Sequence, residues 1–232
     1  MTALGYEFIR KTLDLSAVAP ERPAMTKSVT RVELSESFLA IPRHVASASN
    51  DPLAHVLFAL KHEGTNLQIL AEALPHIDPA CLLLELHKAP NGGYIRLACY
   101  LWEQFSGRQL TDLPEIGGPT QDVFDRNRYI TGPSQRNARW RVAFNGLGSI
   151  RYCATVERTA YLQQAIDSDI LGRTAAFVDS LGTAMMDRVL AWAYLHETGD
   201  SFAIEREAPS GGHETQRRRL SGDVATIFAG CT

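Results

Sequence analysis

The chain has 232 residues, of which 45% are hydrophobic and 21% charged, and its formal net charge is −3. This length corresponds to about one and a half average domains and allows a core that needs no disulfide or metal to hold it. The composition excludes an intrinsically disordered chain, a collagen-like fibre and a small disulfide-rich protein.

The sequence contains no sign of a membrane span or a secretion signal. No apolar segment approaches the ~18 residues that a membrane span needs, and residues 1–15 carry charges where a signal peptide needs an apolar stretch. We therefore expect a cytoplasmic protein with no membrane partner. Its four cysteines form no C-x-x-C pair, so we expect them to be reduced and buried as small apolar side chains.

The N-terminal half predicts a short helix, a hairpin and then four helices. Apolar residues at helical spacing place the first helix within residues 1–15, and β-branched and apolar residues from 29 to 41 predict a small hairpin. The next helices have suitable N-caps in Asp51, Thr65 and Asp78. We expect a compact four-helix unit that ends at Gly107.

The C-terminal half begins with a loop and returns to helices. Residues 110–139 are rich in glycine and proline, and alternating apolar residues on both sides of Asn145–Gly148 predict a second hairpin, over 139–154. Three helices are expected next, at 161–166, 170–181 and 183–196. Gly199 is expected to end the third, and Asp200 to cap a last short helix that stops before Pro209.

These elements predict a mainly α chain of the α+β class, a helical body with two small antiparallel β-hairpins. We divide it into an N-terminal lobe at 1–157 and a helical segment at 158–209, which includes the short helix at 200–208. Residues 210–232 show little periodicity, and we expect them to form a poorly ordered tail.

No catalytic or metal-binding motif is evident in the sequence. It lacks a G-x-S-x-G nucleophile elbow, a glycine-rich phosphate loop and an H-E-x-x-H pair. His55 and His62 share a helix face and could bind a metal with Glu63, although satisfied or solvated histidines explain the pattern better. We therefore assign no catalytic residue and no metal ligand.

One segment concentrates positive charge, because residues 126–152 contain six arginines and no acidic residue. With interleaved aromatic residues, such a segment could bind nucleic acid or an acidic protein. The alternative is that the arginines pair with the chain's own surplus of acids. The candidate contacts are Arg126, Arg128, Arg136, Arg139, Arg141 and Arg151.

A second feature lies in the expected helix at 200–208. Ser201 and Glu205 are four residues apart, so a helix places them on one face and could present a hydroxyl and a carboxylate together to a cationic partner. A capping Asp200 followed by a solvated charged face explains the same spacing.

Four segments, at 58–67, 129–133, 145–148 and 193–205, resemble the N-terminal half of Fic (filamentation induced by cAMP) family proteins. The resemblance implies AMP transfer from ATP to a hydroxyl of a target protein, with magnesium, by a loop of the form H-x-F-x-[D/E]-[G/A]-N-G-R-x-x-R. It also implies that Ser201 and Glu205 belong to an inhibitory helix of the form [S/T]-x-x-x-E-[G/N]. The glutamate of that helix pairs with the last arginine of the loop and displaces the ATP γ-phosphate.

The chain departs from the family pattern in two places. Arg206 stands where glycine or asparagine is usual, and neither H-x-F nor N-G-R occurs in the sequence. The resemblance therefore implies a truncated or split family member: a non-catalytic lobe that restrains, through Glu205, a catalytic lobe supplied in trans. ATP and magnesium would belong to the complete family protein, and this chain alone would need no cofactor.

Two other hypotheses remain open at this stage. One is a binding module for nucleic acid or an acidic protein, which would use the arginines of residues 126–152. The other is an inactive truncated remnant, whose C-terminal helices would expose an apolar surface and favour a homo-oligomer.

Overall fold

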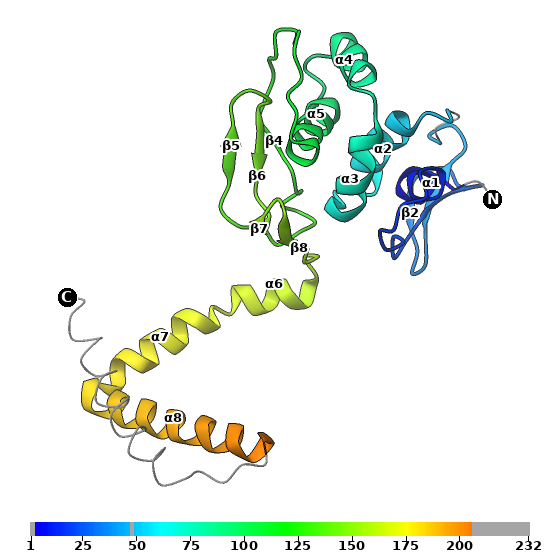
Figure 1. Ribbon diagram of the computed structural model, residues 1–232. Coiled ribbons are helices and arrows are strands. Elements are labelled where there is room, and N and C mark those ends of the chain that lie inside the picture. Colours follow the sequence, from blue (N-terminus) through cyan, green and yellow to red (C-terminus); the bar gives the residue numbers. More distant parts are fainter. Residues whose placement is uncertain (1–2, 47–48, 206–232) are drawn as a thin grey trace. The chain divides into compact units, whose positions relative to one another are not determined.

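The structure is a computed structural model that describes residues 3–46 and 49–205, with the backbone alone for residues 198–205 (Figure 1). The expected tail at 210–232, together with residues 206–208 of the expected last helix, lies outside the described residues. The chain divides into two compact units, Met1–Arg158 and Thr159–Thr232. The predicted α+β class with a helical body is confirmed, because the sheets have only two or three short strands.

The first unit opens with α1 (Gly5–Thr12) and a three-stranded sheet of order β1-β3-β2. In this sheet β3 (Leu39–Pro42) pairs antiparallel with β2 (Glu33–Leu34), which is the predicted hairpin, and parallel with β1 (Ala24–Lys27). No local pattern in the sequence predicts β1, because a parallel partner strand needs no tight turn and leaves no turn signal.

Four helices form the body of this unit: α2 (Pro52–His62), α3 (Leu67–Ala73), α4 (Pro79–Lys88) and α5 (Gly93–Ser106), with the 3₁₀ helix η1 (Leu74–His76) after α3. The caps of α2 and α4 are confirmed, because Asp51 accepts hydrogen bonds from Leu53 and Ala54 and Asp78 accepts one from Ala80. The predicted cap of α3 is wrong, since Asn66 and not Thr65 accepts a hydrogen bond from the Ile69 N–H.

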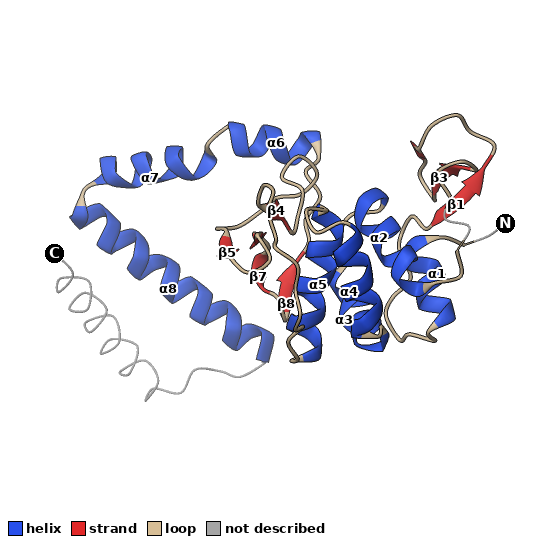
Figure 2. Cartoon of the chain, turned by 90° about the horizontal axis from the view of Figure 1, so that it is seen from above, coloured by secondary structure: helices blue, strands red, loops and turns tan. Residues whose placement is uncertain are grey.

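The core of the first unit surrounds α5, which packs against α2, α3, α4 and η1 (Figure 2). Trp102 of α5 is buried, and its indole N–H donates to the Ile77 carbonyl at 3.2 Å. The expectation for the cysteines holds for Cys99, which is buried, and is wrong for Cys81, which is exposed on α4. Cys153 is half-buried, and Cys231 lies outside the described residues.

A second sheet has the order β4-β6-β5, with β6 (Val142–Phe144) parallel to β4 (Gln121–Asp122) and antiparallel to β5 (Gln135–Asn137). The hairpin predicted over 139–154 is wrong in its pairing, because β6 does not pair with the strand that follows. The observed hairpin is β7 (Leu147–Ser149) with β8 (Tyr152–Ala154). The Asn-Gly pair does not form the turn, since the Asn145 side chain is buried and bonds the backbone of Phe124.

The second unit contains α6 (Ala160–Asp167), α7 (Ile170–Leu181) and α8 (Thr183–Glu205). The predicted ends of α7 are confirmed, with Gly182 at its C-cap. The predicted break at Gly199 is wrong: α8 continues through it, so Asp200 lies inside a helix. One glycine costs a helix only about 1 kcal/mol relative to alanine, which is too little to end it.

Within the described ranges, no single helix has both the length and the apolar composition to cross a membrane. One bent pair, Leu67–His76 with Pro79–Lys88, passes by length and composition. Its residues Leu70, Leu74 and Leu82 are fully buried in the core of the first unit.

Candidate functional site

The connection between α2 and α3, Glu63–Asn66, lies in a segment that carries the family resemblance and is held by three other parts of the first unit. Tyr6 of α1 donates its hydroxyl to the Gly64 carbonyl at 2.7 Å and accepts a hydrogen bond from the Asn66 N–H at 3.2 Å. Arg128 donates to the Glu63 carbonyl at 2.6 Å. The Thr65 hydroxyl donates to the Val123 carbonyl, which explains why it does not cap α3.

Gly64 has a backbone conformation and a packing that both require glycine. Its φ is +89°, in the region that L side chains avoid. A Cβ atom there would lie 2.6 Å from the Tyr129 hydroxyl and 2.8 Å from Nη1 of Arg128. The backbone at position 64 can therefore approach the Arg128 and Tyr129 side chains only because this residue is glycine.

Two open cavities flank Arg128 and Tyr129 and share Thr65 in their walls, with volumes of about 480 and 420 Å³. Charged residues of both signs line each cavity. In the larger these are Lys61, Arg126, Arg128, Asp122 and Asp125, and in the smaller they are Arg22, Arg128, Glu21, Glu63 and Glu157. The walls of the larger cavity have one more positive than negative residue, and those of the smaller have one more negative than positive residue.

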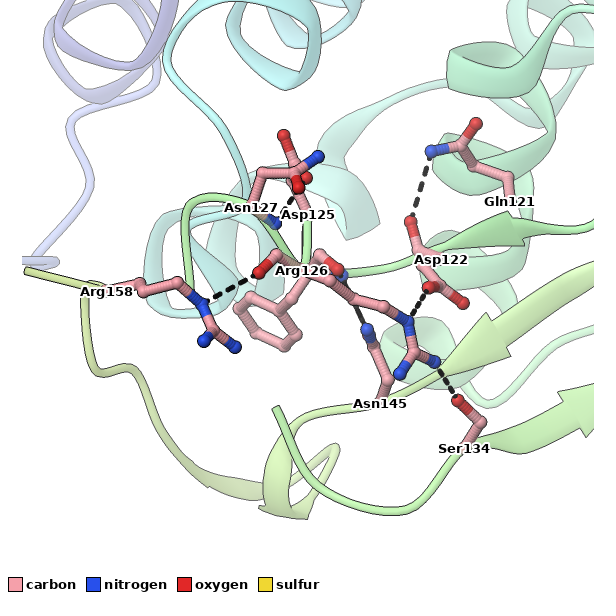
Figure 3. A network of polar contacts seen from close by, with 9 residues as sticks. Gln121, Asp122, Asp125, Arg126, Asn127, Ser134, Asn145 and Arg158 are labelled. Atoms are coloured by element: carbon pink, nitrogen blue, oxygen red, sulfur yellow. Dashed lines mark hydrogen bonds and ion pairs between the residues drawn. The ribbon is translucent and has the colours of Figure 1, made fainter. Parts of the chain in front are cut away.

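Arg126 is at the centre of a polar network beside the larger cavity (Figure 3). Its guanidinium pairs with Asp122 at 2.6 Å and donates to the Ser134 hydroxyl at 2.6 Å. Its own carbonyl accepts a hydrogen bond from Nε of Arg158 at 3.0 Å. The Gln121 side chain donates to the Asp122 carbonyl at 3.2 Å, at an edge strand of the second sheet. These contacts hold the loop after β4 in place.

Arg128 joins this loop to the last residues of the first unit. Glu157 lies between two arginines, 2.9 Å from Nη2 of Arg22 and 3.5 Å from Nη2 of Arg128. Beside these ion pairs the backbone of 128–130 pairs with that of 156–158, through Ile130 N–H to Val156 O at 2.9 Å and Arg158 N–H to Arg128 O at 2.8 Å. The segment that leads to α6 is thus fixed to the first unit.

Three further arginines of the segment also bond inside the first unit. Arg136 donates twice to the Thr120 hydroxyl, Arg139 bonds Glu103 and the Leu110 carbonyl, and Arg141 donates to the Gly118 carbonyl. Arg151 is exposed, and no hydrogen bond or ion pair joins it to another described residue. Five of the six arginines predicted to contact a partner therefore bond other residues of this chain. Carbonyl and hydroxyl groups outnumber carboxylates among the groups that they bond.

The other two resembling segments of the first unit contact each other. The Asn145 side chain accepts from the Phe124 N–H at 2.9 Å and donates to the Phe124 carbonyl at 2.8 Å. The Gly132 N–H donates to the Asn145 carbonyl at 2.9 Å, and a Cβ at Gly132 would lie 2.8 Å from the Gly146 carbonyl. Since Tyr129 touches Gly64, all three segments form one contiguous structural unit.

Glu63 and Tyr6 have shifted pKa values that no sequence pattern indicates. Burial raises the pKa of Glu63 to about 7, against the effect of Arg128 and the Tyr6 N–H, which lower it. Burial also raises the pKa of Tyr6 above its usual value. No local sequence pattern indicates the shift at Glu63, because its side chain accepts a hydrogen bond from Tyr6 of α1, 57 residues earlier in the chain.

The histidines considered as metal ligands have other contacts. His55 uses both ring nitrogens, at 3.1 Å from the Gly5 nitrogen and 2.8 Å from the Ser49 carbonyl, and burial lowers its pKa. His62 packs against the Phe58 ring. In the part of the chain that the structure describes, no three His, Cys, Asp or Glu residues are grouped so that they could hold a metal ion.

Ser201 and Glu205 both lie in α8, one helical turn apart. The structure therefore gives them the helical setting that the sequence predicts, in the last turns of a longer helix. Comparison of the chain with protein-family models, with curated proteins and with solved structures found no match.

Proposed function

We propose that this chain is a non-catalytic regulatory lobe of a Fic-type protein adenylyltransferase, which restrains a catalytic lobe supplied in trans through Glu205. The proposal combines the four resembling segments with one observation, the exposed apolar surface of the second unit. Neither α6 nor α7 has a buried residue, and none of the described side chains of α8 is buried.

The apolar residues of α8 surround the whole helix. The exposed ones are Met185, Val189, Leu190, Trp192, Tyr194 and Leu195, and at 100° per residue their directions cover every side. A helix that is apolar all round is normally the central helix of a larger core. This supports a partner that encloses α8, as a catalytic lobe would, and not one that covers a single face.

The chemistry assigned to Glu205 is competition between anions. A glutamate at the end of α8 would bind the guanidinium that otherwise binds the γ-phosphate of ATP, because Arg forms strong paired hydrogen bonds with either anion. The described residues offer neither a group of metal-ligating side chains nor a phosphate-binding loop. By the family resemblance, ATP and magnesium belong to the catalytic lobe.

The test is AMP transfer by a catalytic Fic fragment mixed with the full chain, comparing Glu205→Gln with the unmodified protein. Loss of one charge-assisted hydrogen bond pair, worth roughly 1.5–3 kcal/mol, should increase AMP transfer by about 10- to 100-fold. Glu197→Gln is the matched control, because it removes an exposed acid from the same helix two turns earlier, and it should leave inhibition intact.

Two results would refute the proposal. The first is binding of the fragment with equal transfer rates for both variants, which would mean that Glu205 does not restrain catalysis. The second is absence of any complex, which would favour the hypothesis of an inactive remnant. The hypothesis of a binding module for nucleic acid or an acidic protein has less support than the regulatory lobe or the inactive remnant. Among the described residues, only Arg151 of its six arginines lacks a partner.

A further inference from the structure

Strand β4 lies at the edge of the second sheet and leaves backbone groups free on its outer side. The N–H groups of Gln121 and Val123 donate to the carbonyls of Arg141 and Ala143, at 2.9 and 3.0 Å. Since backbone groups alternate in direction along a strand, the N–H and carbonyl of Asp122 face away from β6. The carbonyl accepts from the Gln121 side chain (Figure 3), and no described residue accepts a hydrogen bond from the N–H.

This free edge opens into a concave surface made of two adjacent cavities. Residues 120–123 line the larger of the cavities that flank Arg128. A third cavity, of about 360 Å³, lies between α2, the end of α4 and the start of α5. Lys61 of α2 and Tyr94 of α5 line both, so the edge of β4 and the third cavity belong to one surface.

The third cavity has mostly apolar walls. The apolar residues that line it, besides Tyr94, are Val45, Ala54, Leu57, Phe58, Ala89 and Ile95. Its volume and its walls suit one or two apolar side chains of a ligand. A strand edge beside an apolar hollow is the combination that binds extended peptides, because the edge pairs with the backbone and the hollow selects a side chain.

Lys61 provides an unpaired positive charge where the two cavities meet. Its side chain is exposed, and no hydrogen bond or ion pair joins it to another described residue. The other charged groups of these walls have partners: Arg126 pairs with Asp122, Arg128 with Glu157 and Glu85 with Lys88, and Asp125 accepts the Asn127 N–H. The charge left to be complemented is therefore positive, and a carboxylate complements it.

We propose that this surface binds an extended, acidic segment of a partner protein. The backbone of the segment pairs with Asp122 at the free edge of β4, an apolar side chain enters the third cavity, and a carboxylate lies beside Lys61. A nucleic acid has no amide backbone to pair with a strand edge, and it needs several unpaired cations, whereas the described walls offer Lys61. The inference goes beyond the role proposed for Glu205 and does not depend on it.

The experiment titrates the full chain with a capped heptapeptide of alternating glutamate and leucine residues. NMR follows the backbone amides of the chain, and fluorescence anisotropy of the labelled peptide gives the affinity. Binding should shift the Asp122 amide signal and slow its hydrogen exchange. The same peptide with N-methylated backbone amides should bind at least about tenfold more weakly, because it cannot donate to the strand edge.

Two variants with matched controls test the side-chain contacts. Ala89→Trp fills the third cavity and should weaken binding by about tenfold or more, since the leucine is excluded. Ala80→Trp is its control, because it places the same ring at an exposed site on α4 outside the cavities. Lys61→Glu should weaken binding by about fivefold or more. Arg151→Glu reverses an exposed, unpaired charge outside both cavities and should leave the affinity unchanged.

Several results would overturn the proposal. One is binding that leaves the Asp122 amide unchanged, or equal affinity for the N-methylated peptide. Another is equal affinity for a peptide in which lysine replaces glutamate, which would show that Lys61 does not select a carboxylate. The absence of binding by the glutamate–leucine peptide would also refute it. Shifts of the Asp122 amide that depend on protein concentration without peptide would assign the edge to a second copy of the chain.

Discussion

Arg96 shows at the residue scale how this fold uses a positive charge that has no negative partner in the part of the chain that the structure describes. Its side chain is 1% exposed and donates to the carbonyls of Pro119, Trp140 and Arg141 at 2.9–3.2 Å. Nε is buried without a hydrogen-bond partner among the described residues, and burial lowers the pKa. The planar guanidinium connects α5 to two loops at once, which the single ammonium of lysine could not do.

We predict that Arg96→Met lowers the free energy of unfolding by about 2–4 kcal/mol, because it leaves buried carbonyls without donors. Arg108→Met is the control, since its exposed guanidinium lies over the Trp102 ring at 5.3 Å, and it should cost under about 1 kcal/mol. Urea denaturation followed by Trp fluorescence measures both. Equal losses in the two variants would show that the buried contacts of Arg96 contribute little.

A matched pair of glycines separates backbone strain from steric overlap. Gly64 and Gly107 both have positive φ, +89° and +68°, but a Cβ at Gly107 would meet nothing within 4 Å. Gly107→Ala should cost about 1–2 kcal/mol from strain alone. Gly64→Ala should cost at least about 1 kcal/mol more, because it also displaces Arg128 and Tyr129. Thermal unfolding of the two variants would contradict this if their midpoints were equal.

At the element scale, a prediction from the sequence is correct where the hydrogen-bond partner of a side chain lies close to it along the chain. Asp51 and Asp78 were predicted correctly as caps because their partners are two or three residues away. Thr65 was not, because its hydroxyl bonds Val123, 58 residues away. The same reason explains the hairpin error: Asn145 precedes a glycine, as a turn residue would, but bonds Phe124, 21 residues away.

The Asn145 side chain connects β6 to the end of the β4 segment by bonding both backbone groups of Phe124. Asn145→Ala should lower the free energy of unfolding by about 2–4 kcal/mol, because it leaves a buried N–H and a buried carbonyl unpaired. Asn145→Asp keeps an acceptor and loses the donor, and it also buries a charge, so we expect no rescue. Asn137→Ala offers a comparison at a half-buried site, where the side chain accepts only the Trp140 N–H. A similar loss at both sites would contradict the prediction.

At the scale of the whole molecule, the two units differ in what holds them together. Every buried apolar residue among the described positions lies at or before Phe144. We therefore predict that a chain ending at Arg158 folds alone and retains the unfolding transition of the first unit. Calorimetry of the shortened and full chains checks this, and a transition midpoint lowered by more than about 5 °C would show that the second unit stabilises the first.

The candidate site was predictable from the sequence only in part. Ser201 and Glu205 lie in a helix as predicted, but in the last turns of α8 and not in a separate short helix capped by Asp200. The role of the arginines did not follow from their charge, because their partners are mostly carbonyls and hydroxyls from other segments, such as Gly118 for Arg141. Short-range patterns are visible in a sequence, whereas contacts made after the chain has folded are not.

The length of α8 gives it mechanical leverage. Its 23 residues extend about 35 Å at 1.5 Å per residue. A tilt of about 5° at Thr183 would therefore move the far end by roughly 3 Å, about the length of one hydrogen bond. If Glu205 must contact a guanidinium to act, a small change in the tilt of α8 at Thr183 is enough to form or break that contact.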